Sequence, residues 1–206
     1  MADGIRTITI VLFDGFELLD VFGPAELFGS ERERLRVQYI AETHEPVHAI
    51  QGVAIVPDFS YADAPTPDIV LVPGGMGTRK LVADAAFLAW LKAWGADAAL
   101  VTSVCTGSGV LAAAGLLEGY RATSNKRSFA WASSNGIGVE WVPAARWVED
   151  RDRWTSSGVA AGMDMAAALL DHLFGPGTGQ AAADSAELEL HTDPAWDPFA
   201  AQNGLA

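Results

Sequence analysis

The chain contains a single cysteine, Cys105, within the stretch "TSVCTG" (residues 102–107). An apolar run, "AALV", precedes this stretch, and the small-residue segment "SGVLAAAGLL" follows the cysteine. The pattern places the cysteine at a strand-to-helix turn, where α/β hydrolases present their nucleophilic serine. The N–H groups and positive dipole end of the following helix favour a thiolate. The sequence therefore predicts an accessible, substantially ionised nucleophile at Cys105, against the alternative of a buried small hydrophobe.

Asp20 is the candidate acid that accompanies the cysteine. It lies in a predicted helix among the apolar residues Leu18, Leu19, Val21 and Phe22. Desolvation raises the pKa of a carboxyl group, which suits it to donating or carrying protons. The alternative role for Asp20 is a helix-capping residue ahead of Pro24. The nearby charges of Asp14 and Glu17 are expected to be exposed in a loop.

Glycines surround the predicted nucleophile. Gly74 and Gly75 follow the buried run "DIVLVP", and they could offer an N–H to an anion that forms opposite the sulfur. Gly107 and Gly109 follow the cysteine and allow close backbone approach. A histidine base is not expected, because none of the four histidines lies at a predicted strand end; they are His44, His48, His172 and His191.

Alternating strands and helices must position these residues. Strands are predicted at residues 7–13, 36–42, 68–75, 98–105, 139–144 and 146–157, with two short strands in 47–58. Helices are predicted at 17–29, 83–94, 106–117, 128–134 and 160–174. Such alternation favours a mostly parallel sheet with helices on both faces, whose ligands bind at the carboxyl ends of the strands. Asp20, Gly74, Gly75 and Cys105 are expected to meet at that edge.

Length and composition limit the class of protein. The 206 residues fit one α/β domain, with residues 175–206 as a C-terminal tail of loose composition. Hydrophobic residues make up 50% of the chain, which disfavours disorder. No apolar run is long enough to span a bilayer, and the N-terminus lacks the pattern of a secretory signal. With one cysteine, a cytoplasmic protein without disulfides is expected.

The formal net charge of −13 disfavours nucleic acid as a partner, because such a chain repels phosphate backbones. Two clusters of arginines are interleaved with acidic residues and are interpreted as solvated surface. They are Arg32, Arg34 and Arg36, and Arg146, Arg151 and Arg153.

Four segments together resemble the DJ-1/PfpI superfamily: "FDGFELLDVFGPAELF", "IVLVPGGMG", "VTSVCTGSGVLAAAGLLEGYRAT" and "SSGVAAGMDMAAALL". The resemblance is to the branch of isocyanide (isonitrile) hydratases and of the related domains of AraC-type regulators. It implies a flavodoxin-like three-layer sandwich and a homodimer. Seven tryptophans, more than a small core readily buries, are a further reason to expect a dimer.

The resemblance also implies roles for individual residues. Cys105 matches the nucleophile, Asp20 its acidic partner and Thr106 the threonine that follows the cysteine in hydratases. Gly75 matches the oxyanion-hole glycine, and Gly158 with Val159 matches a loop that lines the pocket. Asn125 departs from the family, because related proteins often carry a histidine in that region.

Hydration of a small isonitrile, without a metal or other cofactor, is the activity that the resemblance implies. The chain has no HExxH, Cys/His cluster, GxGxxG or Walker motif. Three alternatives remain open: an amidase-like or glyoxalase-like activity, a ligand-sensing module like the regulator domains, and a redox response of Cys105. The regulators carry a C-terminal helix-turn-helix domain, for which this chain is expected to end too soon.

Overall fold

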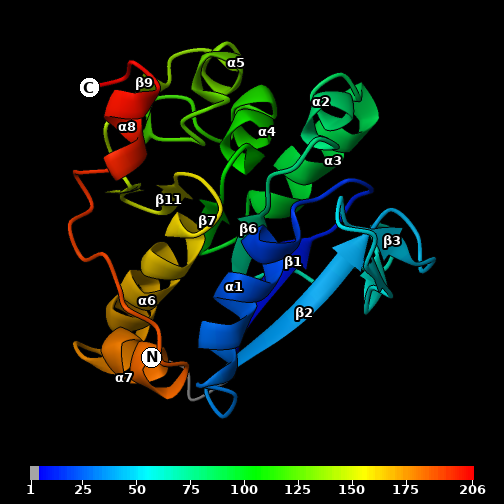
Figure 1. The fold of residues 1–206 in the computed structure, drawn as a ribbon. Coiled ribbons are helices and arrows are strands. Elements are labelled where there is room, and N and C mark those ends of the chain that lie inside the picture. Colours follow the sequence, from blue (N-terminus) through cyan, green and yellow to red (C-terminus); the bar gives the residue numbers. More distant parts are fainter. Residues whose placement is uncertain (1–4) are drawn as a thin grey trace.

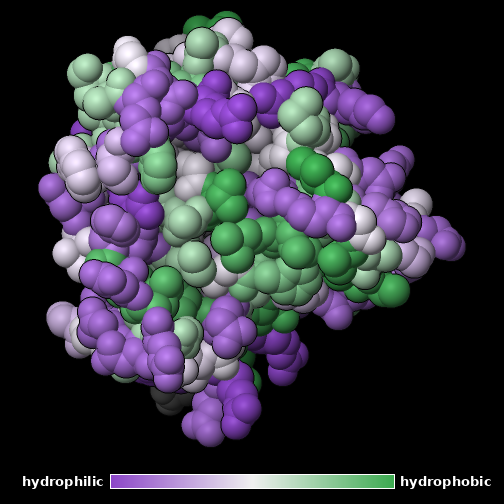
Figure 2. All heavy atoms as spheres, in the orientation of Figure 1, coloured by the Kyte–Doolittle hydropathy of each residue, from purple (hydrophilic) through white to green (hydrophobic). Residues whose placement is uncertain are grey.

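A computed structural model describes residues 5–206 of the chain (Figure 1). Residues 1–4, part of the segment considered for a secretory signal, lie outside the described residues. Among the described residues, no helix combines the length and apolar character needed to cross a membrane. On the surface, an apolar area lies among mostly hydrophilic residues (Figure 2).

A seven-stranded sheet forms the centre of the fold, in the order β10-β11-β7-β6-β1-β2-β5. Its parallel core consists of β1 (Arg6–Val11), β2 (Leu35–Ala41), β6 (Ile69–Val72) and β7 (Leu100–Ser103). The short β5 (Phe59–Ser60) and β11 (Arg153–Ser156) extend it in parallel, and β10 (Trp147–Asp150) is antiparallel to β11. The β6 and β7 residues are all buried, as expected for strands covered on both faces.

Helices cover both faces of the sheet (Figure 1). Ile8 and Ile10 of β1 belong to the apolar cluster that includes residues of α1 (Leu18–Gly29), α6 (Ala161–Phe174) and α7 (Thr178–Ser185). Val11 belongs to the opposite cluster, with residues of α3 (Ala85–Gly95) and α4 (Gly107–Ala113). Because side chains alternate along a strand, one strand supplies both layers. The predicted three-layer, flavodoxin-like α/β fold is confirmed.

Most predicted elements are present, including the antiparallel pair β3 (Val47–His48) and β4 (Ala54–Ile55) and the helix α5 (Phe129–Ser133). Asp84 caps α3 as typical N-cap residues do, by accepting from the N–H groups of Ala86 and Phe87. Three short elements were not anticipated: α2 (Thr78–Leu81), β8 (Arg121–Ala122) and β5. β8 pairs with β9 (Glu140–Trp141).

The C-terminal tail is more ordered than its composition indicated. It contains α7 and a second helix, α8 (Pro198–Gln202). Between them the chain runs back along α6 toward the opposite end of the molecule (Figure 1).

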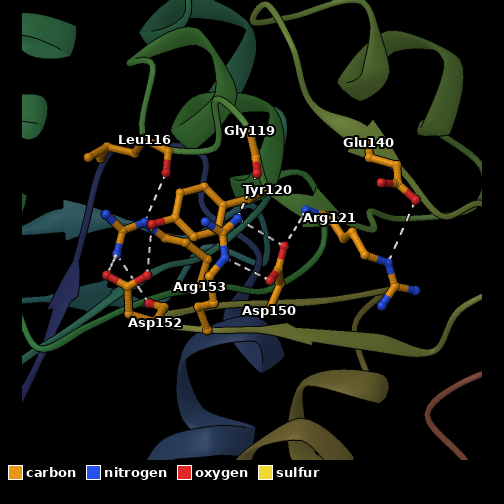
Figure 3. A network of polar contacts seen from close by, with 9 residues as sticks. Leu116, Gly119, Tyr120, Arg121, Glu140, Asp150, Asp152 and Arg153 are labelled. Atoms are coloured by element: carbon orange, nitrogen blue, oxygen red, sulfur yellow. Dashed lines mark hydrogen bonds and ion pairs between the residues drawn. The ribbon is translucent and has the colours of Figure 1, made fainter.

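The second arginine cluster is not simply solvated surface. Arg153 donates to the Leu116 carbonyl at 2.9 Å (Figure 3). Arg151 donates to the Gly119 carbonyl at 2.6 Å. Both arginines also pair with neighbouring aspartates. Arg146 contradicts the surface interpretation, since it is only 4% exposed and binds Asp164 at 2.6 Å. Its charge is tolerated in the interior because a buried carboxylate compensates it.

Candidate active site

Three adjacent strands bring the predicted site residues to one edge of the sheet. β1, β6 and β7 are neighbours and run parallel, so the segments that follow them emerge side by side. Phe16, in the loop after β1, forms a bridge to Gly75 in the loop after β6. The structure therefore places Asp20, Gly74 and Cys105 together, as the sequence predicted.

Cys105 occupies a strained turn between β7 and α4. Its φ of 57° lies in the left-handed region, which a residue with a side chain rarely adopts. Hydrogen bonds hold the turn on both sides: the Cys105 N–H donates to the Ser157 carbonyl at 2.9 Å, and the Cys105 carbonyl accepts from the Ser124 hydroxyl at 2.9 Å. Strain that is fixed by its surroundings in this way is typical of functional sites.

The thiol is neither accessible nor readily ionised, contrary to the expectation from the helix N-terminus. Cys105 is only 6% exposed. Burial raises the pKa of the thiol, and the negative charge of Asp20 raises it further. The Thr106 N–H and hydroxyl and the Asn125 amide oppose this increase by donating to the sulfur. The dipole argument fails because desolvation outweighs it.

Asp20 lies in the first turn of α1, completely buried, and it does not cap the helix, whose N-cap residue is Glu17. Its Oδ2 accepts from the Gly74 N–H at 2.8 Å, and its Oδ1 has no hydrogen-bond partner among the described residues. Burial raises the pKa of Asp20 to about 7, and the Glu17 charge adds to this increase. The Gly74 N–H and the Cys105 thiol act in the opposite direction and lower the pKa. The carboxyl can therefore exchange a proton near neutral pH.

Gly74 lies at the centre of the site, in close contact with the residues around it. A Cβ atom at this position would lie 2.6 Å from the Thr106 nitrogen, 2.7 Å from Asp20 Oδ2 and 2.8 Å from Cys105 Cβ. Real Cβ atoms do not approach other atoms so closely. The missing side chain thus lets the thiol and the carboxyl approach one another across the glycine backbone.

Gly75 and Thr106 are joined rather than separate. Gly75 has a φ of 128°, and its N–H donates to Thr106 Oγ1 at 3.0 Å. The Thr78 hydroxyl donates to the Gly75 carbonyl at 2.6 Å and secures this loop. In this arrangement the Gly75 N–H orients the Thr106 hydroxyl beside the sulfur, whereas the sequence led us to expect a free oxyanion donor.

Asn125 contributes to the site although it was noted only as a departure from the family pattern. Its side chain donates to the sulfur, and its Oδ1 accepts from the Ser128 N–H at 3.1 Å. A Cβ at Gly158 would lie 2.8 Å from the Asn125 amide nitrogen, so Gly158 leaves room for the amide. The available signal was its position shortly after "RAT" (residues 121–123), where related proteins often carry a histidine.

Arg79 was missed, because nothing in its local sequence marks it. Its guanidinium donates to the Ser128 hydroxyl at 3.0 Å and stacks over the Trp131 ring at 3.9 Å. It also donates to the Gly75 carbonyl at 3.3 Å. Arg79 therefore links the Gly75 loop to the segment that holds Asn125.

A cavity of about 450 Å³ adjoins the thiol site. Asn125, Gly158 and Val159 line it, together with residues of α8. The predicted pocket loop at Gly158 and Val159 thus borders an actual cavity. The histidines lie elsewhere: His44, His48 and His172 face the carboxylates of Asp63, Asp14 and Glu149, and the His191 N–H donates to Asp164.

Comparisons with known proteins agree on one family. The model of the DJ-1/PfpI family matches residues 6–172. An isonitrile hydratase from Pseudomonas putida is 35% identical over 194 residues, which cover 93% of this chain and 80% of the relative. The transcriptional regulator GbdR from Pseudomonas aeruginosa is 32% identical over 82% of this chain but only 46% of its own length. A solved THiJ/PfpI family protein from Pseudomonas syringae has a TM-score of 0.81 and 34% identity, covering 95% of this chain and 78% of that protein.

Proposed function

Because the chain belongs to the DJ-1/PfpI family, we propose that it hydrates isonitriles to N-substituted formamides, with Cys105 as the nucleophile and Asp20 as the proton carrier. The observation that carries this proposal is the pairing of a buried thiol with a buried carboxyl around Gly74. The similarity to an isonitrile hydratase supports the same substrate class.

In the first step the sulfur of Cys105 attacks the terminal carbon of the isonitrile, R–N≡C. The thiol proton passes to Asp20, and Asp20 delivers a proton to the same carbon as negative charge develops on it. The S–H bond breaks, one C–S bond and one C–H bond form, and the product is a thioimidate, R–N=CH–S–Cys105. Formation of the thioimidate needs no net uptake or release of protons. The Cys105 thiol and the Asp20 carboxylate, which together hold one transferable proton, are therefore suited to this step.

In the second step water adds to the thioimidate carbon, with Asp20 as the base that takes a proton from the water. Asp20 passes this proton to the nitrogen, which gives the tetrahedral adduct R–NH–CH(OH)–S–Cys105. The C–S bond then breaks as the carbonyl forms, and the hydroxyl proton passes through Asp20 to the sulfur, which releases R–NH–CHO and restores the thiol. Thr106 and Asn125 donate to the sulfur and stabilise the thiolate as it leaves. Their donation is worth most at this point, because the sulfur then carries its largest negative charge.

The test is release of formamide from several isonitriles, measured beside Cys105→Ser and Cys105→Ala. We expect turnover by the wild type and none above the uncatalysed rate by either variant. Parallel assays with amide and 2-oxoaldehyde substrates address the amidase-like and glyoxalase-like alternatives. Turnover of those compounds without turnover of any isonitrile would reject the proposal in favour of another activity of the family.

We also propose a homodimer that covers an apolar face of the molecule. Leu19 and Phe22 of α1 and Met76 after β6 are exposed, as are Ile50, Val53 and Val56 around the β3–β4 hairpin. These segments are adjacent, since the Phe16 carbonyl accepts from the Ile50 N–H and the Leu18 N–H donates to Gln51. An apolar area lies on the face that carries α1 (Figure 2). Monomers rarely expose large contiguous apolar patches.

Sedimentation at micromolar concentration tests the dimer. Phe22→Glu should weaken association, because it places a charge within the apolar face. Ile137→Glu is the matched control, since Ile137 is exposed but lies in the loop after α5. A wild type that sediments only as a 21.7 kDa monomer would exclude the dimer.

A further inference from the structure

The cavity beside Asn125 is lined by both apolar and cationic residues. It lies between the Asn125–Arg127 segment, the Gly158–Ala160 segment and α8. Its volume of about 450 Å³ is within the range of small-molecule sites. Asn125 connects it directly to the reaction, because the same side chain that lines the cavity donates to the Cys105 sulfur.

The geometry of the reactant directs its substituent into this cavity. An isonitrile is linear from the substituent through nitrogen to carbon, and the sulfur adds to the terminal carbon from the side of this axis, so the substituent lies two bonds beyond the attacked carbon and needs space next to the sulfur. Asp20, Gly74 and the Thr106 backbone crowd one side of the sulfur, where no space remains even for one additional carbon atom at Gly74. Asn125 and Gly158 border the cavity side.

The cavity walls combine apolar surface with positive charge. Val159, Ala160 and Phe199 supply apolar contacts, and Lys126, Arg127 and Arg146 supply cationic side chains. Arg146 is compensated by Asp164, at 2.6 Å, and by Asp197, at 3.8 Å. The other two cations, Lys126 and Arg127, form no ion pair with any residue in the range 5–206, although the chain carries a formal net charge of −13.

Lys126 is a buried residue of the cavity wall, and hydrogen bonds hold its side chain in place. It is only 4% exposed, and its ammonium group donates to Thr123 Oγ1 at 2.9 Å and to the Ala145 carbonyl. An ammonium group has three N–H donors, so these two bonds leave one, on a nitrogen that also lies 5.7 Å from the centre of the Phe129 ring. Burial lowers the pKa of Lys126 to about 8, and the Asp197 charge offsets this only in part, so a bound anion would stabilise the cationic form. Arg127 is exposed at the edge of the cavity, where it can pair with the same anion.

The opposite wall is held in place by buried polar contacts. The Arg146 N–H donates to the Pro194 carbonyl at 2.8 Å, and the Asp197 N–H donates to the Ala144 carbonyl at 2.9 Å. Asp197 Oδ1 then caps α8 by accepting from the Phe199 N–H at 2.8 Å. The C-terminal segment is therefore docked against the strand end at Arg146, and Phe199 faces the cavity at a defined position.

We propose that this cavity binds the N-substituent of the isonitrile, and that the preferred substrates carry a carboxylate on an apolar substituent, recognised by Lys126 and Arg127. The inference rests on the proposed function and specifies its substrate class. The apolar part packs against Val159 and Phe199, and the carboxylate reaches the two cations.

A matched pair of substrates tests this proposal: 4-isocyanobenzoate and its neutral methyl ester. We expect the wild type to prefer the carboxylate in kcat/KM by about tenfold, and Arg127→Gln to reduce this ratio roughly three- to tenfold through a higher KM for the carboxylate. Arg36→Gln is the control, since it removes the same charge from an exposed position on β2. A ratio near one in the wild type, or a ratio unchanged in Arg127→Gln, would overturn the proposal.

A binding measurement tests the carboxylate site independently of the proposed isonitrile hydratase activity. The probe is 4-formamidobenzoate, titrated calorimetrically into Cys105→Ser and into Cys105→Ser combined with Arg127→Gln. We expect binding that weakens at least about threefold without Arg127. If the wild type hydrates neither isonitrile, the proposed function fails, and this titration still decides the cavity's ligand class. Absence of binding, or equal binding by both variants, would reject the carboxylate site.

Discussion

Asp20 Oδ2 accepts a hydrogen bond of 2.8 Å from the Gly74 N–H, while Oδ1 of the same carboxyl has no hydrogen-bond partner among residues 5–206. The first contact fixes the orientation of the carboxyl group, and Oδ1 is left without a hydrogen bond that would hold its proton or its charge. A group that is fixed at one oxygen and free at the other is suited to transfer a proton without changing its position.

Asp20→Asn should reduce turnover of an isonitrile by roughly 10²–10⁴-fold, the usual contribution of a general acid–base group. The amide keeps the bond from Gly74 but cannot exchange a proton. Asp20→Glu should retain partial activity if the longer carboxyl still reaches the sulfur. Asp14→Asn is the control, since Asp14 is exposed and an amide oxygen can still accept from the His48 N–H. Full activity of Asp20→Asn would refute the assignment.

Glu17, which the sequence predicts to be an exposed loop charge, is a poor control because its charge raises the pKa of Asp20.

The pH profile of kcat/KM should rise through about pH 7, because burial raises the pKa of Asp20 to about 7. Below that pH both the carboxyl and the thiol are protonated, and no base is present to take the thiol proton. Above it the pair holds one transferable proton. The rise should be absent from the residual activity of Asp20→Asn. A wild-type profile that is flat from pH 5 to pH 9, a range of about four units, would contradict this pairing.

The thiol of Cys105 should titrate above the free-cysteine value in the wild type, because burial and then the Asp20 charge raise its pKa. Asp20→Asn removes the second cause and should lower the thiol pKa. Ultraviolet absorbance of the thiolate measures both values, with Cys105→Ser as the blank. A variant pKa equal to or higher than that of the wild type would show that the carboxyl does not act on the sulfur.

Asp20→Asn should also stabilise the fold at alkaline pH. The folded-state pKa of Asp20, about 7, exceeds its ordinary value of 3.8, so the folded state binds the proton more tightly than the unfolded state does. The contribution of the protonated carboxyl to the free energy of unfolding is fully present below about pH 4 and is lost as the pH rises to about 7. The variant has no such proton to lose, so at about pH 8 its free energy of unfolding should be higher by roughly 2–4 kcal/mol. Thermal melts of the wild type and the variant at about pH 4 and about pH 8 measure this difference in stability. Equal melting temperatures of the two proteins at alkaline pH would contradict the prediction.

Gly74→Ala should abolish turnover and destabilise the protein, because the new methyl group would overlap Thr106, Asp20 and Cys105. We expect a loss of roughly 1–3 kcal/mol, the range for overpacking a buried position. Gly29→Ala is the matched control, since a Cβ there has no atom within 4 Å and alanine favours the helix. An active, stable Gly74→Ala variant would show that the close approach at this glycine is not required.

The strand ends were predictable from the sequence because the mostly apolar runs before Gly74 and Cys105 end in glycine or small residues. That pattern determined the sheet, its two covered faces and the meeting of Asp20, Gly74 and Cys105. The ionisation of the thiol was not predictable, because it depends on desolvation by segments distant in sequence. The partners of Asn125 and Arg79 were also hidden, since they meet only through Ser128. The division of the chain into a single domain stays a prediction.

The register of β6 and β7 defines the distance between Gly74, which follows β6, and Cys105, which follows β7. Leu71 pairs with Thr102 across these strands, and Gly74 and Cys105 each follow their paired residue by three positions. Equal spacing on both sides means that a deletion of one residue within β7 would shift Cys105 along the edge and turn its side chain to the other face of the sheet. Substitutions within these strands leave this spacing unchanged. Among natural variants of this sequence, changes of length between the strands and the site residues should therefore be far rarer than changes of residue type.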